Sequence, residues 1–200
     1  MAEFSLAVTE GLLEEPVVRK VLSDLGVLAT GLRVIVKGGR TAFWDDVRRY
    51  DRAAGYLGPI LGLADLESFP CPSGLIAQHL PQGRQKLFIL RVAERMLESW
   101  LLADSEAMAG FLRISVRTLP RDPERESHPK LTLINLARRS RVRRVRDDLI
   151  PEEGSIGVVG RGYVPRMTEF VEHHWRPQVA ANRSESLKRA IAAIKKAAEQ

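Results

Sequence analysis

Short apolar runs alternate with amphipathic stretches along the first half of the chain. Glycine, proline or acidic residues border most of these runs, which is the pattern of buried strands. The predicted strands span residues 4–9, 32–36, 60–64 and 87–92. Between them, helical spacing of apolar positions predicts helices over 13–25, 41–54 (capped by Thr41) and 73–80. Strands joined through helices imply an α/β fold, with a mainly parallel four-stranded sheet flanked by helices.

From residue 93 onward the apolar period is helical. Helices are expected over residues 93–103, 104–112, 130–146 and 184–198, and Asp104 is the expected cap of the second. Prolines and four glycines predict turns over residues 151–165. We therefore expect a sheet-bearing core, residues 1–112, and a basic helical extension, residues 113–200, packed on that core.

The composition of the chain indicates an anionic binding partner. The chain of 200 residues has 31 Lys+Arg against 25 Asp+Glu, a formal net charge of +6. Arginine predominates among the basic residues, which favours recognition of phosphate, although many basic proteins bind nothing acidic. The single Cys71 excludes an internal disulfide and a multi-cysteine zinc site, and it favours the reducing cytoplasm. No apolar stretch approaches the roughly 20 residues that span a bilayer, so we expect no membrane association.

Acidic residues lie where two predicted strands end. Glu10 follows the first strand, and Asp65 and Glu67 follow the third. Ligands of open parallel sheets bind outside the carboxyl ends of the strands. Residues i and i+2 of an extended chain face the same way, so Asp65 and Glu67 would share one Mg²⁺ or Mn²⁺, and Glu10 would join them if the two strands are neighbours. The alternative is that these are solvated acids at loop starts, with Asp65 as a helix cap.

The sequence around these acids resembles the Toprim domain of topoisomerases, primases and OLD-family nucleases. The likeness rests on Val8-Thr9-Glu10-Gly11 before a helix and on a strand that ends in Asp65-Leu66-Glu67. A closer likeness is to small Toprim-like bacterial proteins that are often encoded beside AAA ATPases. It is carried by RMLESWLLAD at 95–104, HPK at 128–130, RDDLIP at 146–151, GY at 162–163 with TEFV at 168–171, and the segment 175–187 that ends RSESL.

The resemblance implies roles for the acids. Glu10 matches a glutamate expected to bind metal or transfer a proton, and Asp65 and Glu67 match an Asp-x-Asp metal pair. Here the second member is glutamate, which is one methylene longer and shifts the ion, so the departure bears on catalytic strength more than on metal binding. Glu98 matches an acid that can hold a second metal. Its alternative is a solvated helix face shared with Glu94, while Leu97, Trp100 and Leu101 are expected to be core.

Two basic features complete the candidate site. Lys130 follows Pro129 at a predicted helix start, where it would stabilise the charge that develops in phosphoryl transfer, or be an ordinary surface lysine. A run of arginines would grip a nucleic-acid backbone through bidentate phosphate contacts. Its members are Arg138, Arg139, Arg141, Arg143, Arg144 and Arg146. The alternative is neutralisation by the acids that follow, Asp147, Asp148, Glu152 and Glu153.

These observations predict a metal-dependent nuclease that acts on DNA or RNA, working with an AAA ATPase in bacterial defence or DNA repair. One alternative is a catalytically silent binding or regulatory subunit of the same fold. Another is a hydrolase or transferase of nucleotide phosphates. The glycine-rich stretch 154–162 lacks the pattern of a P-loop, so no ATPase activity is expected of the chain itself. The oligomeric state is left open.

Overall fold

The sheet has four strands, all parallel. In the computed structural model, which describes residues 3–27 and 29–199, the strands are β1 (Leu6–Thr9), β2 (Arg33–Val36), β3 (Ile60–Asp65) and β4 (Phe88–Ala93). Their order is β2-β1-β3-β4, so β1 and β3 lie side by side at the centre. The α/β prediction and the four strand positions are confirmed, and the sheet is wholly rather than mainly parallel.

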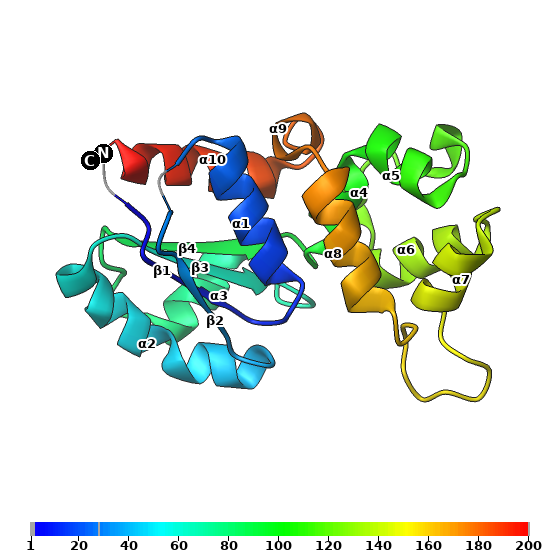
Figure 1. Cartoon of the computed structure of the whole chain (residues 1–200). Coiled ribbons are helices and arrows are strands. Elements are labelled where there is room, and N and C mark those ends of the chain that lie inside the picture. The colour runs from blue at the N-terminus through cyan, green and yellow to red at the C-terminus, as the bar shows by residue number, and fades with distance from the viewer. Residues whose placement is uncertain (1–2, 28, 200) are drawn as a thin grey trace.

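Helices cover both faces of the sheet (Figure 1). Helices α1 (Glu14–Asp24) and α10 (Glu185–Ala198) cover one face, and α2 (Arg40–Leu57) and α3 (Pro72–His79) cover the other. Alternation along β1 explains the two layers, because Ala7 packs with the first pair of helices and Val8 with the second. In α10 the apolar positions Leu187, Ala190, Ile191 and Ile194 are buried, and Ser184 caps the helix by accepting from Leu187 N at 3.2 Å.

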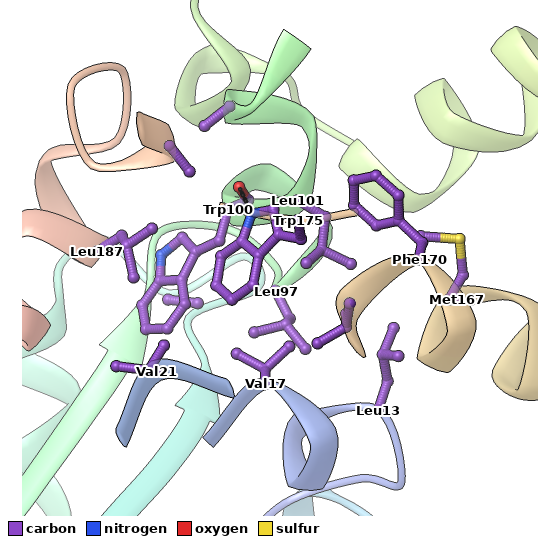
Figure 2. Packing of buried hydrophobic residues seen from close by; sticks show 14 of the residues in the cluster. Leu13, Val17, Val21, Leu97, Trp100, Leu101, Met167, Phe170, Trp175 and Leu187 are labelled. Atoms are coloured by element: carbon purple, nitrogen blue, oxygen red, sulfur yellow. Dashed lines mark hydrogen bonds between the residues drawn. The ribbon is translucent and has the colours of Figure 1, made fainter. Parts of the chain in front are cut away.

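The remaining helices stand beside the sheet (Figure 1). They are α4 (Glu98–Ala103), α5 (Ser105–Leu112), α6 (Pro129–Arg138), α7 (Arg143–Leu149), α8 (Tyr163–His173) and α9 (Pro177–Ala180), with short 3-10 turns at Val116–Thr118 and Pro123–Arg125. The expected core role of Trp100 is confirmed, and Trp175 Nε1 donates to its carbonyl at 3.2 Å (Figure 2). The hydrophobic cluster that contains both tryptophans includes residues from each side of position 112.

Three local predictions were wrong. Residues 93–97 are not helical, because β4 continues to Ala93 and Arg95 is left-handed (φ 63°), so Glu94 and Glu98 do not share a helix face. The helix expected over 130–146 is two helices, separated at 139–142 where Ser140 Oγ accepts from Val142 N at 3.1 Å. Gly39 rather than Thr41 is the cap residue of α2. The predicted cap Asp104 is confirmed, since it accepts from Ala107 N at 3.3 Å.

The expected turn segment is shorter than predicted, because α8 already begins at Tyr163. A Cβ on Gly160 would lie 2.7 Å from the carbonyl oxygen of Ile150, and one on Gly162 would lie 2.7 Å from Asp148 Cβ. These two glycines therefore let the segment pack directly on the end of α7. The glycine-rich stretch thus has a packing role in this fold.

One hydroxyl ties the C-terminal helix to the chain after β4. Ser186 Oγ accepts from Trp100 Nε1 at 2.7 Å and from Glu94 N at 3.2 Å, and it donates to Glu124 Oε1. Ser186→Ala should lower the free energy of unfolding by about 2 kcal/mol, because two N–H donors lose their acceptor. Chemical denaturation measures this. Ser23→Ala, at an exposed helix position, should stay within about 0.5 kcal/mol of wild type; equal losses in the two variants would contradict the prediction.

Candidate acidic metal site

The carboxyl ends of β1 and β3 bring Glu10 and Asp65 together. The two strands pair in parallel, as the shared-metal expectation required, and Asp65 N donates to Glu10 Oε2 at 3.4 Å. Asp65 Oδ1 accepts from Leu97 N at 2.8 Å, which fixes this carboxylate beneath the start of α4. Both acidic residues are buried. The two acids predicted at the strand ends, Glu10 and Asp65, therefore lie side by side at the carboxyl edge of the sheet.

A cleft of about 410 Å³ opens over these two residues. We call it the acidic cleft. Its polar side chains come from the ends of two strands, from the starts of α1, α4, α6 and α8, and from the turn after β3. They belong to Glu10, Glu14, Asp65, Glu67, Glu98, Lys130 and Tyr163. The cleft thus lies where ligands of parallel sheets are expected.

Glu98 is the most enclosed acid of the cleft. Its side chain is 3% exposed, and its Oε1 accepts from Tyr163 OH at 2.7 Å. Lys130 Nζ, from the first turn of α6, lies 3.5 Å from the same oxygen. Glu98 Oε2 is buried without a hydrogen-bond partner among the described residues. A buried carboxylate oxygen with no donor is costly, so this atom is available for a ligand of positive charge.

Three acids of the cleft, Glu10, Glu14 and Asp65, have raised pKa values. Burial raises the pKa of Asp65 well above its usual range, and the nearby charges of Glu98, Glu14 and Glu10 raise it further. Burial, followed by the charges of Glu98 and Glu10, raises the pKa of Glu14 from 4.5 to about 7. The pKa of Glu10 is also raised by burial, against the hydrogen bond from Asp65 N. Burial opposes the charge of Lys130, but Glu98 and Asp65 outweigh it and raise its pKa.

Glu67 lies at the rim of the cleft rather than on its floor. Its backbone is left-handed (φ 54°), so the alternation of an extended chain does not hold there. The side chain is 44% exposed, and its Oε2 lies 3.4 Å from Arg40 Nη1. The same Arg40 atom donates to the Asp65 carbonyl at 3.0 Å. Glu67 therefore lines the same cleft as Asp65 but already has a cationic partner.

The carboxylate oxygens that line the acidic cleft are suitable ligands for a hard divalent cation. All its acidic donors are carboxylate oxygens, which Mg²⁺ and Mn²⁺ prefer, and Lys130 is the only cation among the residues that line the cleft. The described residues include no group of three His, Cys, Asp or Glu side chains already arranged to hold a metal ion. Glu10, Glu14, Asp65 and Glu98 are the buried carboxylates that line the cleft.

Sequence reasoning missed three residues of this cleft. Glu14 was overlooked although it follows Glu10 by four residues and opens a helix, a spacing that returns its side chain toward the strand end. Tyr163 was noted only within a motif of the resemblance. Arg40 gave no local signal, because its contact with residues 65 and 67 depends on the packing of α2 against β3. His128, two residues before Lys130, is exposed, and its side chain does not cap α6.

The arginine run is largely unpaired. Arg143 Nε lies 3.4 Å from Asp147 Oδ2, and Arg146 donates to the carbonyl of Ser140. Within the described residues, the other four arginines form no ion pair, and all four are exposed. They are Arg138, Arg139, Arg141 and Arg144. The following acids are instead occupied elsewhere, Asp148 by Arg166 and Glu152 by Arg161. Self-neutralisation therefore accounts for only one member of the run.

Comparisons of the chain with protein-family models, with curated proteins and with solved structures give no match. Among the described residues, no helix combines the length and apolar character needed to cross a bilayer.

Proposed function

We propose that the chain is a metal-dependent nuclease of Toprim-like type, with Mg²⁺ or Mn²⁺ in the acidic cleft and DNA or RNA as substrate. The observation that carries the proposal is the convergence of four buried carboxylates beside Lys130 at the carboxyl edge of the sheet. The sequence resemblance supports the same reaction class. It also supports the proposals of an AAA ATPase partner and of a role in defence or DNA repair.

Each residue has a role in this proposal. Asp65, Glu10, Glu14 and Glu98 would hold the cation, which when bound would activate a water and polarise the phosphodiester. Lys130 would neutralise charge that develops on the phosphate oxygens. Tyr163 would orient Glu98 through its hydrogen bond. The unpaired arginines would hold the nucleic-acid backbone, because their guanidinium groups are free to contact phosphate.

The direct test is cleavage of end-labelled single-stranded DNA, duplex DNA and RNA with Mg²⁺, with Mn²⁺ and with a chelator. We expect cleavage that needs the cation and disappears with the chelator. Release of product from nucleoside triphosphates, with nucleic acids left intact, would point to the hydrolase or transferase of nucleotide phosphates instead. No cleavage of any substrate, with and without a co-encoded ATPase, would contradict the nuclease proposal.

A second candidate is a metal-binding subunit that no longer cleaves. The favouring observation is Glu67, whose carboxylate is paired with Arg40 at the rim. Retained binding of Mn²⁺ and of nucleic acid without cleavage would identify this case. Glu67→Asp separates the two further, because an active enzyme adapted to glutamate should lose rate, whereas a silent site restored to the family pattern should gain it.

The arginine run makes a prediction about salt. Replacement of Arg138, Arg141 and Arg144 by glutamine should weaken binding to duplex DNA of any sequence. Each lost phosphate contact removes about 0.9 from the slope of log affinity against log salt, so the slope should flatten by roughly 2.7. Fluorescence anisotropy over a range of KCl concentrations measures this slope. Replacement of Arg113, Arg117 and Arg121 by glutamine removes the same charge elsewhere and should flatten the slope less. If the two triple variants flatten the slope equally, net charge alone determines the binding.

A further inference from the structure

A second hollow, of about 540 Å³, lies between α2 and the turn that leads into β4. We call it the basic hollow. Its cationic side chains are those of Arg48 and Arg52 from α2 and of Arg84 and Lys86 from the turn. The turn precedes Phe88, the first residue of β4, whereas the acidic cleft lies beyond the last residues of β1 and β3. The two hollows share no residue.

The charge of the basic hollow is not balanced from within. Four cationic side chains face one carboxylate, that of Asp51, which leaves an excess of three positive charges (four minus one). Asp51 is 9% exposed, and its Oδ1 accepts from Gln85 N at 2.8 Å, so this carboxylate holds the turn in place. Within the described part of the chain, none of the four cations lies in an ion pair. The basic hollow therefore carries a net positive charge, which favours an anionic ligand.

Two of the cations are held in position by the fold. Arg48 Nε donates to the His79 carbonyl, and Arg84 Nη1 donates to the Leu90 carbonyl, each at 2.9 Å. These bonds use one N–H of each guanidinium and leave the others free. Arg91 is half-buried on β4. Its pKa is lowered mainly by burial and further by the nearby charge of Arg84. Asp51 is the one carboxylate of the hollow that offsets these charges, and an anion that joined them would lower their mutual repulsion.

The size and lining of the basic hollow indicate a small ligand. Its volume falls within the range of about 300–1,000 Å³ that is typical of small-molecule sites. Gln82 and Gln85 add amide groups, and Leu80 and Pro81 add a small apolar surface. We propose that the basic hollow binds a small molecule that carries two or more linked phosphate groups. This proposal does not depend on the nuclease proposal, because the two sites share no residue.

Isothermal titration with inorganic triphosphate, in metal-free buffer of low ionic strength, tests the proposal. We expect saturable binding of one equivalent. Arg52→Gln with Lys86→Gln should weaken it by about tenfold or more, since charged hydrogen bonds to phosphate are lost. The matched control removes two charges elsewhere, as Arg113→Gln with Arg117→Gln, and should bind as wild type does. Both changes are at exposed positions, and circular dichroism verifies the fold.

The outcomes separate the possible sources of the phosphate group. Tighter binding of a nucleoside triphosphate than of inorganic triphosphate would support the proposal and assign the amide and apolar groups to the nucleoside. Equal binding of nucleoside triphosphate and inorganic triphosphate would also support the proposal, and would show that the site recognises the phosphate groups alone. Absence of saturable binding would overturn it. So would an equal loss of binding in the control variant and in the hollow variant, which would show that net charge alone decides binding.

Discussion

Asp65→Asn should reduce metal-dependent cleavage of nucleic acid by at least about 100-fold, the usual cost of losing one preorganised electrostatic contact in an active site. Asparagine keeps the side-chain oxygen that accepts from Leu97 N at 2.8 Å, so the local fold should persist. It removes the charge of a buried carboxylate whose pKa is raised by burial and by the neighbouring acids. The variant should also bind Mn²⁺ more weakly, because one anionic oxygen ligand is gone.

The test compares initial cleavage rates and Mn²⁺ titrations of wild type and variant. Asp45→Asn, an exposed change on α2 with the same loss of charge, is the matched control and should retain the wild-type rate. Cleavage by Asp65→Asn at the wild-type rate would remove Asp65 from the reaction. If wild type and Asp65→Asn are equally inactive and bind nucleic acid equally well, the silent-subunit alternative is favoured.

Glu14→Gln should stabilise the metal-free protein at pH 8 and have little effect at pH 4.5. The pKa of Glu14 is raised from 4.5 to about 7 by burial and then by Glu98 and Glu10. The folded state therefore binds more protons than the unfolded state between these values, and wild-type stability falls as pH rises from about 4.5 to about 7. Glutamine has no such loss. The difference in unfolding free energy should reach about 3 kcal/mol above pH 7, at 1.36 kcal/mol for each pKa unit.

Denaturant unfolding at the two pH values, with a chelator present, measures this difference. Glu15→Gln changes the next residue, which is partly exposed and pairs with Arg19, and should alter stability by less than about 0.5 kcal/mol at both pH values. A Glu14→Gln effect that is the same at low and high pH would show that the residue acts through packing. Addition of Mg²⁺ at pH 8 should stabilise wild type more than Glu14→Gln, if Glu14 is one of the metal ligands.

Much of the fold follows from the pattern of the sequence. The four apolar runs became the four strands, and the periodic stretches between them became the helices that make the sheet parallel. Glu10 and Asp65 could be placed at one edge because parallel strands end on the same side. Local signals were weaker where backbone conformation changed within a few residues. At Arg95 a left-handed residue separates β4 from α4, and at 139–142 the chain turns between two basic helices.

The sequence by itself determined the strand positions, the helix period and the acids at the strand ends, because short-range sterics and burial periodicity are encoded locally. Only the tertiary structure decided which side chains meet. Glu98, Lys130 and Tyr163 come from three separate helices, and their contact depends on how those helices pack. It also decided that Glu14 is buried and Glu67 exposed, and burial is the largest cause of the raised pKa of Glu14. Burial and long-range charge are properties of the packed chain, so no local pattern contains them.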